Sequence, residues 1–193
     1  MYGFRIIENI ERPPKELLEQ LEPFTTADIC DGCVVFDAMD HQIKPYVTKK
    51  KIIGPAITVK VPSGEGDIVV KAIDLAQKGD IIVIAGHGNC ASSYWGDNRS
   101  KKAMDAGVSG VVIDGAFRDF EDCEVIGLPV YAKGLTSGSA VKSGMGEINV
   151  PVSCGGVVVN PGDIIVGDVN GVCVIPKEYA LEIIENIKKK LGI

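Results

Sequence analysis

Residues 81–115, IIVIAGHGNCASSYWGDNRSKKAMDAGVSGVVIDG, decide the fold class of this 193-residue chain. Two apolar runs, IIVIAG at 81–86 and SGVVIDG at 109–115, have the continuous hydrophobic character of strands that are buried on both faces. The segment WGDNRSKKAMDAG at 95–107 lies between them and indicates a helix that Gly107 closes. A strand, a helix and a second strand at this spacing predict a parallel pair of strands joined by a crossover helix.

The rest of the chain extends this unit to an α/β fold with a mixed sheet and a β-rich C-terminal part. Patterns of helical period predict helices within residues 13–24, 25–33, 66–80, 121–127 and 177–191. Strands are predicted at 54–62 and 128–134, followed by strand-and-turn segments at 147–152 and 155–176.

Several residues mark where these elements begin and end. Thr25 or Thr26 is expected to cap the second helix, which Gly32 stops, and Asp67 is expected to open the third. The segment at 86–96 is predicted to be a strand-to-helix loop. The last helix is expected to place four residues on one apolar stripe: Tyr179, Ile183, Ile184 and Ile187.

The length and charge of the chain limit the number of domains and the functional classes to which it can belong. The chain suits one domain over residues 1–193, and a net charge of −6 argues against a general nucleic-acid binder. No window approaches the apolar length of a membrane span and the N-terminus has no signal-peptide core, so we expect a cytoplasmic protein with no membrane contact. Without a secretory signal, the six cysteines are expected to be thiols.

Two familiar motifs are weak in this sequence. Cys30-Asp-Gly-Cys33 is a CxxC, but there is no second CxxC, and His41 and His87 are the only histidines, so a zinc site is not indicated. The loop at 86–96, GHGNCASSYWG, lacks both GxGxxG and the P-loop pattern. The start of the helix that follows can still hold a small anion such as a carboxylate.

A stronger constellation comprises Asp97, Arg118, Asp119 and Asp122. Asp97 is expected at the start of one helix, and the other three follow the next strand. The loops after parallel strands lie at one edge of the sheet, where ligands usually bind. Three carboxylates suit a hard divalent cation, and an arginine can bind a substrate carboxylate through two hydrogen bonds. The alternative is an ordinary surface ion pair between Arg118 and Asp122 or Glu121.

These residues resemble a motif of the RraA-like family, which includes class II 4-hydroxy-4-methyl-2-oxoglutarate aldolases. That motif is an Asp, twenty residues, Arg-Asp, two residues and then Asp or Glu, and Asp97, Arg118, Asp119 and Asp122 satisfy it. Similarity extends through TTADICDG at 25–32, AGVSGVVIDGAFRD in the middle of the chain and INVPVSCGGVVVNPGDIIVGDVNGVCVIP near the end.

The resemblance implies roles for the site residues. Asp119 would bind Mg²⁺ or Mn²⁺ directly, Asp122 and Asp97 would hold metal-bound waters, and Arg118 would bind the substrate. The substrate loop would be Gly96, Asp97, Asn98 and Arg99. The resemblance also implies a swivelling β/β/α fold and assembly into homotrimers or hexamers. Arg99 departs from the family, because an apolar residue is common there, and so does the sequence GHGNCASSY before the loop.

The implied reaction is the metal-dependent cleavage of a 4-hydroxy-2-oxo acid to pyruvate, with oxaloacetate decarboxylation as a side activity. Both reactions pass through an enolate that a divalent cation stabilises. In this scheme Arg118 fixes the substrate carboxylate, and a polarised water near Asp97 carries the proton.

Three alternatives remain open from the sequence. Some members of the family resemble a regulator that inhibits ribonuclease E through protein–protein contact, a role that an acidic surface suits. A Schiff-base aldolase would use Lys133 or Lys142, although both are expected to be solvated in a Gly- and Ser-rich region. His87 follows a strand and could assist proton transfer, although a loop histidine satisfied by local hydrogen bonds is the commoner case.

Overall fold

The predicted strand–helix–strand unit lies at the centre of the sheet. The structure, a computed structural model, describes residues 3–33 and 37–193. In it β3 (Ile81–Ser93) and β4 (Gly110–Phe117) pair in parallel, and α4 (Asp97–Asp105) connects them. Gly107 has a left-handed φ of 78° just beyond α4, a conformation that glycine adopts without steric cost, so it ends the helix as predicted.

The other elements follow the predicted order, except that the strand at Lys44–Val47 was not predicted. The further helices are α1 (Lys15–Leu21), α2 (Thr26–Gly32), α3 (Ile68–Leu75), α5 (Phe120–Ile126) and α6 (Ala180–Leu191), with a 3₁₀ turn at Lys177–Tyr179. The further strands are β1 (Lys44–Val47), β2 (Ile52–Lys60), β5 (Val130–Leu135), β6 (Glu147–Ile148), β7 (Val152–Cys154), β8 (Val157–Val159), β9 (Ile164–Asp168) and β10 (Gly171–Ile175).

A single long strand, β2, joins a parallel and an antiparallel part of the sheet. The strand order is β1-β5-β4-β3-β2-β9-β10, and β6 pairs with the end of β2. Residues 56–60 of β2 pair in parallel with β3, whereas residues 52–55 pair antiparallel with β9. The sheet therefore turns through β2 from the βα units into the C-terminal hairpin, which confirms the mixed α/β fold and its β-rich C-terminal part.

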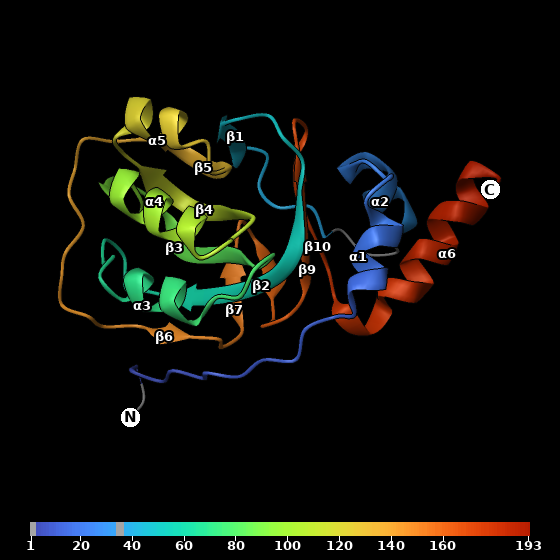
Figure 1. Cartoon of the computed structure of the whole chain (residues 1–193), viewed down its shortest axis with the longest axis horizontal. Coiled ribbons are helices and arrows are strands. Elements are labelled where there is room, and N and C mark those ends of the chain that lie inside the picture. The colour runs from blue at the N-terminus through green and yellow to red at the C-terminus, as the bar shows by residue number, and fades with distance from the viewer. Residues whose placement is uncertain (1–2, 34–36) are drawn as a thin grey trace.

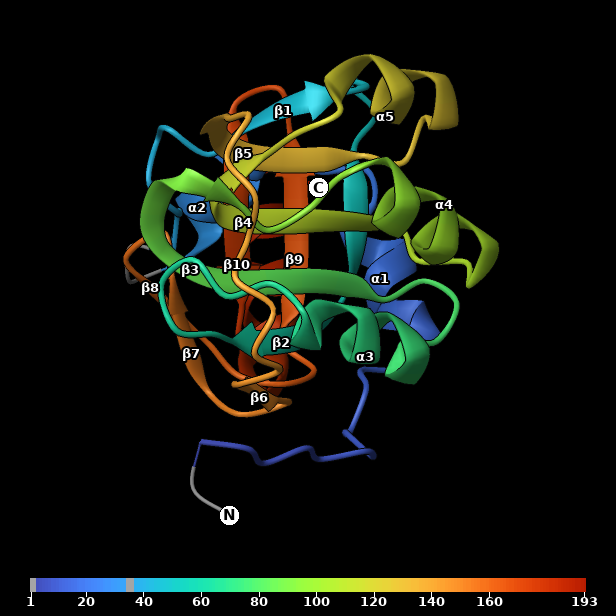
Figure 2. The same ribbon diagram turned by 90° about the vertical axis from the view of Figure 1, so that its left-hand side faces the viewer.

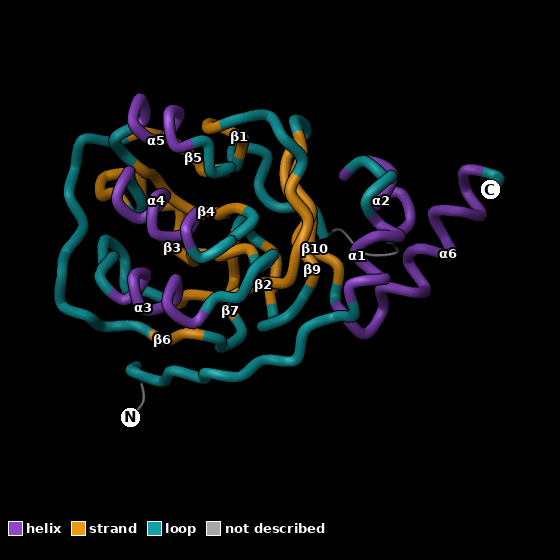
Figure 3. The backbone as a smooth tube through the Cα atoms, viewed as in Figure 1, coloured by secondary structure: helices purple, strands orange, loops and turns teal. Residues whose placement is uncertain are grey.

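The apolar side chains form three clusters between layers. The helices α3, α4 and α5 cover one face of the parallel strands and α1, α2 and α6 lie beyond β9 and β10, while strands fill the space between the two helical groups (Figures 1 and 3). Ile57, Ile82 and Trp95 belong to the cluster under the first helical group, and Val83 and Tyr131 belong to the cluster between the strand layers. The third cluster lies under the second helical group.

The second helix shows its predicted start. The Thr25 hydroxyl accepts a hydrogen bond from the Asp28 N–H, and the Asp28 carboxylate accepts one from the Thr25 N–H, which completes a capping box. At the other end, a Cβ on Gly32 would lie 2.4 Å from Ile187 Cγ1 of α6. Glycine is therefore required there by the close approach of two helices.

Two expectations about side chains and loops are wrong. Tyr179 lies in the 3₁₀ turn before α6 and is 58% exposed, so only the three isoleucines form the buried stripe. The segment expected to be a loop at 86–96 continues β3 as far as Ser93, with Asn89 opposite Gly115 and Ser93 opposite Ala116. The left-handed residues His87 and Gly88 interrupt the pairing, which is why this segment has no strand periodicity.

No helix within residues 3–33 and 37–193 combines the length and the apolar character needed to cross a lipid bilayer.

Candidate active site at the ends of β3 and β4

The predicted site residues line a cavity of about 270 Å³ beside the ends of β3 and β4. The start of α3, the start of α4 and the loop from residue 136 to 146 complete its walls. The lining residues that the sequence predicted are Gly96, Asp97, Asn98, Arg99, Arg118 and Asp119. Those that it missed are Asp67, Val70, Ser93, Trp95, Ser139 and Ala140, and Lys142, which the sequence named only for the Schiff-base alternative, lines it too. One cavity thus contains both halves of the motif, which are separated by a helix and a strand.

Asp119 is held in an unusual backbone conformation. It has a left-handed φ of 56° at the position just before α5, and its carbonyl accepts a hydrogen bond from the Cys123 N–H at 2.9 Å. Aspartate tolerates this region better than most residues, but it is still uncommon outside glycine. Such conformations tend to occur where the side chain must be aimed at a ligand.

Gly96 makes room for the Asp119 carboxylate. A Cβ at position 96 would lie 2.7 Å from Asp119 Oδ2, which is closer than a carbon and an oxygen can approach. The φ of Gly96 is −174°, which any residue can adopt, so the glycine is required by contact and not by backbone conformation. The start of α4 therefore lies directly against the start of α5 at this position.

Arg118 points along the cavity and is held at both ends. Its backbone N–H donates to the Trp95 carbonyl at 3.1 Å, its Nη1 donates to Ser139 Oγ at 3.0 Å, and its Nε lies 3.2 Å from Asp119 Oδ2. Its side chain is 43% exposed. The alternative pairing with Asp122 or Glu121 is absent from the ion pairs of the described residues, so the guanidinium faces the cavity.

The loop before α4 is anchored by buried aromatic residues. Trp95 is fully buried, and its Nε1 donates to Ser100 Oγ at 2.7 Å. The Tyr94 hydroxyl donates to the Gly86 carbonyl and accepts from the Gly64 N–H. These bonds fix the segment that carries Asp97, which is half-buried at the cavity wall and accepts a hydrogen bond from Asn98 Nδ2 at 3.0 Å.

Arg99 is the most buried charged group of the cavity. Its Nη1 donates to the Tyr94 carbonyl at 2.9 Å and its Nη2 donates to the Gly66 carbonyl at 2.8 Å. Burial lowers the pKa of Arg99 from its ordinary value, nearby Asp67 raises it, and the positive charge of Arg118 lowers it. The guanidinium of Arg99 is thus close enough to Arg118 for the two charges to interact.

Two of the predicted residues lie outside this cavity. Asp122 belongs to the first turn of α5, where it is exposed and does not line the cavity. His87 lines a different cavity, beside Met145 and Glu147, and its Nε2 lies 3.0 Å from the Val61 carbonyl. His87 is thus held by a hydrogen bond to a neighbouring backbone carbonyl, which is the structural alternative named from the sequence.

The loop at 136–146 was missed as part of the site. It leaves β5 and passes across the ends of the neighbouring strands toward β6 (Figure 2). Its Gly138 carbonyl accepts from the Ser93 N–H at 2.9 Å, and its Val141 N–H donates to the Gly64 carbonyl. The sequence could have predicted this position. The loop follows β5, which runs parallel to β4, and therefore begins at the same edge of the sheet.

The two lysines of the Schiff-base alternative have different environments. Lys133 was expected to be solvated, which is wrong: its side chain is 14% exposed, and its Nζ lies 2.9 Å from Asp40 Oδ2 and 2.8 Å from Asp114 Oδ1. Although burial opposes the charged form, the two carboxylates prevail and raise the pKa of Lys133. A Schiff-base lysine needs a lowered pKa. Lys142 is exposed and lines the cavity.

The residues of the cavity fit a cation bound mainly through water. No group of three or more His, Cys, Asp or Glu side chains in the described ranges is arranged as a closed metal site. Asp119 and Asp97 supply carboxylate oxygens at one cavity, and glycine at position 96 leaves space beside Asp119 Oδ2. Mg²⁺ commonly binds through one or two carboxylates and keeps several waters.

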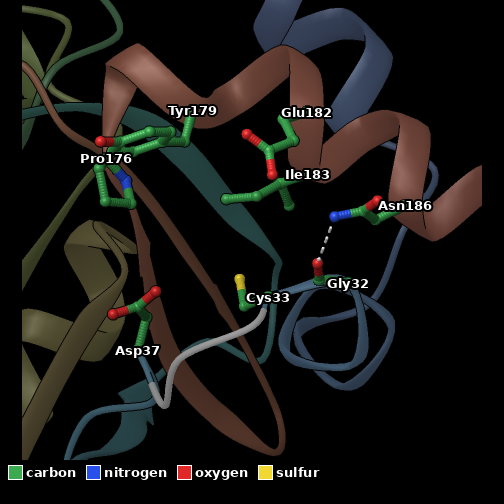
Figure 4. Close-up of a pocket in the computed structure, with 8 residues that line it drawn as sticks. All are labelled: Gly32, Cys33, Asp37, Pro176, Tyr179, Glu182, Ile183 and Asn186. Carbon is green, nitrogen blue, oxygen red and sulfur yellow. Dashed lines mark hydrogen bonds between the residues drawn. The ribbon is translucent and has the colours of Figure 1, made fainter.

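A second cavity, of about 260 Å³, lies on the other side of the sheet, between α2 and α6. Figure 4 shows the Cys33 thiol, the Asp37 carboxylate and the Glu182 carboxylate around it, together with the apolar side chain of Ile183. Burial and the negative charge of Asp37 raise the pKa of Cys33 to about 11. Cys33 is thus protonated near neutral pH, and all six cysteines are free thiols.

Comparison with known proteins identifies the class that this fold and cavity define. The family model described as Aldolase/RraA matches residues 26–174, so the chain belongs to the RraA-like family.

Two similar proteins are of bacterial and archaeal origin. A protein of Halalkalibacterium halodurans named "Putative 4-hydroxy-4-methyl-2-oxoglutarate aldolase" is 39% identical over 175 residues, which cover 91% of this chain and 83% of that protein. An uncharacterized protein of Methanocaldococcus jannaschii is 42% identical over 171 residues, which cover 87% of this chain and 80% of that protein.

A solved structure shares the fold. RraAS2 of Streptomyces coelicolor, described as an unusual member of the RNase ES inhibitor RraA protein family, aligns with a TM-score of 0.85 and 27% identity. The alignment covers 95% of this chain and 96% of that one. The family thus includes proteins named as aldolases and proteins named as inhibitors of an RNA-processing enzyme.

Proposed function

We propose that the protein is a divalent-metal-dependent lyase that cleaves a 4-hydroxy-2-oxo acid to pyruvate and also decarboxylates oxaloacetate. The observation that carries the proposal is the convergence of Arg118, Asp119 and Asp97 on one cavity. The similarity to proteins named as 4-hydroxy-4-methyl-2-oxoglutarate aldolases supports this reaction class.

The side chains divide the work by their chemistry. Asp119 would hold Mg²⁺ or Mn²⁺ directly, and Asp97 would orient its waters. The role that the resemblance gives Asp122, holding a metal-bound water, would have to be exerted from outside the cavity lining. When bound, the cation supplies Lewis-acid stabilisation of the negative charge that develops on the keto oxygen of the substrate as its C3–C4 bond breaks. Arg118 binds the substrate carboxylate with its guanidinium, which Ser139 and Asp119 already orient. A water held beside Asp97 would accept or return the proton.

The proposal is tested by pyruvate release from 4-hydroxy-4-methyl-2-oxoglutarate and from oxaloacetate, with Mg²⁺ or Mn²⁺ and with EDTA. We expect turnover that EDTA abolishes. Asp119→Asn should reduce kcat/KM by about a hundredfold or more, because it removes the direct carboxylate. Arg118→Gln should raise KM and lower kcat.

The matched control is Asp105→Asn, at the exposed end of α4, which should leave the kinetics unchanged. Turnover that survives EDTA, or normal kinetics in Asp119→Asn, would contradict the metal mechanism. Borohydride trapping of the protein with pyruvate would instead point to Lys142.

The second candidate function is regulation of ribonuclease E by protein–protein binding. The structural similarity to an RNase ES inhibitor and the net charge of −6 favour it. Inhibition of purified ribonuclease E, together with no metal-dependent turnover of any 2-oxo acid, would support this role over the lyase. In either role we expect a homotrimer or hexamer, which light scattering on the purified protein would measure, and a cytoplasmic location.

A further inference from the structure

Arg99 differs from the other arginines of the chain in its partners. Arg5 pairs with Glu147, Arg12 with Asp80 and Arg118 with Asp119. Arg99 instead donates to two neutral backbone carbonyls, those of Tyr94 and Gly66. Within residues 3–33 and 37–193 it is the arginine that forms no ion pair with a carboxylate.

The lack of a carboxylate partner matters because Arg99 is half-buried. A buried charge is costly unless an opposite charge and hydrogen bonds compensate for it. Asp67 lies on the same cavity and acts on Arg99 over a longer distance, but it forms no ion pair with it. A guanidinium carries five N–H donors, and the two carbonyls each engage one nitrogen, so donors remain for a ligand.

The surroundings hold this guanidinium at the cavity wall. A Cβ at Gly66 would lie 3.5 Å from Arg99 Nη2 and 2.8 Å from the Ala140 Cβ. Glycine at position 66 therefore allows the close approach of Ala140, which brings the loop at 136–146 against the start of α3, with the Arg99 guanidinium in ordinary contact distance. Arg99 and Arg118 reach the same cavity from different elements. Arg99 lies in the first turn of α4, and Arg118 directly follows β4.

We propose that Arg99 binds a second carboxylate of the substrate, so that the site selects 2-oxo acids with two carboxylates over those with one. The inference rests on the proposed function for the first carboxylate, which Arg118 binds. Arg99 is then a specificity-determining residue: a dicarboxylate supplies a directly paired counter-charge, whereas Asp67 and Glu65 act on Arg99 without forming an ion pair with it. The other role for Arg99 is purely structural, a clamp between the Gly66 and Tyr94 segments.

Equilibrium binding separates these two roles without requiring turnover. Calorimetry with Mn²⁺ present would compare 2-oxoglutarate, which has two carboxylates, with 2-oxobutanoate, which has one. We expect the wild-type protein to bind 2-oxoglutarate about tenfold more tightly or better. Arg99→Gln should abolish that preference, so that the two ligands bind about equally, and leave 2-oxobutanoate binding unchanged. Arg118→Gln should weaken the binding of both ligands.

Two further variants guard against an effect of stability alone. Arg99→Lys keeps the positive charge but loses the planar guanidinium that can bind a carboxylate through two hydrogen bonds. It should retain part of the preference for the dicarboxylate. Arg12→Gln removes a buried arginine far along the chain from the cavity, and it should lower the melting temperature without changing the preference. Equal weakening of both ligands by Arg99→Gln, or a wild-type protein without preference, would overturn the inference.

The outcomes also separate the inference from the proposed function. Turnover of 2-oxo acids without a dicarboxylate preference would retain the lyase and reject the role of Arg99. A dicarboxylate preference that Arg99→Gln abolishes, in a protein that turns over no 2-oxo acid, would retain the binding role and reject the lyase.

Discussion

At the scale of single residues, the candidate site depends on one contact between two loops. Asp119 has a left-handed backbone, and its carboxylate lies against Gly96. Each residue restricts the other, because the glycine leaves room for the carboxylate and the backbone of Asp119 directs it there. A small change at position 96 should therefore act on the chemistry of Asp119 while the fold remains intact.

Gly96→Ala tests this contact. The added Cβ would lie 2.7 Å from Asp119 Oδ2, so the carboxylate must move. We expect pyruvate release to fall by about tenfold or more and Mn²⁺ affinity to fall with it. The melting temperature should change little, because alanine adopts the extended φ of −174° without strain.

Gly134→Ala is the matched control for this change. A Cβ there would lie 3.8 Å from Cys90 Sγ, an ordinary contact, and the backbone is not left-handed. Normal Mn²⁺ affinity in Gly96→Ala would show that Asp119 does not hold the cation in this position.

At the scale of elements, short helices are positioned by their ends. The helix α2 has seven residues, too few for stability on its own, and depends on its capping box and on packing against α6. The hydrogen bonds from Thr25 to the Asp28 carboxylate lower the pKa of Asp28. The cap therefore favours the charged form of this residue at the N-terminus of the helix, where a negative charge is stabilising.

Thr25→Ala tests the cap. It removes the hydroxyl that accepts from the Asp28 N–H, and we expect the melting temperature to fall by about 2–4 °C. Activity should be unchanged, because α2 lies on the opposite side of the sheet from the candidate site. Glu19→Ala in α1 removes an exposed ion pair with Lys15 and should cause a smaller shift. Equal shifts in the two variants would contradict a special contribution of the cap.

At the scale of the whole molecule, the N-terminal segment is fixed to the sheet by a buried carboxylate. The Arg5 guanidinium donates to Glu147, whose side chain is 2% exposed, with Nη2 at 3.0 Å from Oε2. Lys60 of β2 lies 3.5 Å from the same group. The hydrogen bond from Arg5 is the main cause that lowers the pKa of Glu147 from 4.5 to about 2, although burial acts against it.

This shift predicts an acid-dependent loss of stability. A carboxyl with a lowered pKa in the folded state stabilises the fold above its ordinary pKa of 4.5, and the contribution disappears as the pH falls from about 4.5 to about 2. Glu147→Gln should lower the free energy of unfolding by about 1–2 kcal/mol at pH 7. The difference from wild type should vanish near pH 2.

Urea unfolding across this pH range measures the effect. The control is Glu8→Gln, in the N-terminal segment and exposed, which should follow the wild-type curve. A constant difference between Glu147→Gln and wild type at all pH values would contradict the ionic origin of the contribution.

The sequence by itself determined the strand–helix–strand unit, the order of the elements apart from β1, and the residues of the acidic motif. These follow from local causes: apolar period, caps, turn residues and the fixed distance between Asp97 and Arg118. The edge rule for parallel strands brought the two halves of the motif together correctly. It would also have included the loop at 136–146, had that loop been recognised as the end of a parallel strand.

Only the tertiary structure decided which side chains share a cavity and which do not. Asp122 lies outside the cavity that Asp119 lines, two carboxylates pair with Lys133, and the irregular pairing within β3 carries His87 to another cavity. The hydrogen-bond partners of Arg99 could not be predicted from the sequence either, because they are backbone carbonyls, which every residue has. The exposure and the partners of a charged side chain depend on residues that folding brings close to it. The distances between these residues are set by packing between the layers of the fold and not by their spacing along the chain.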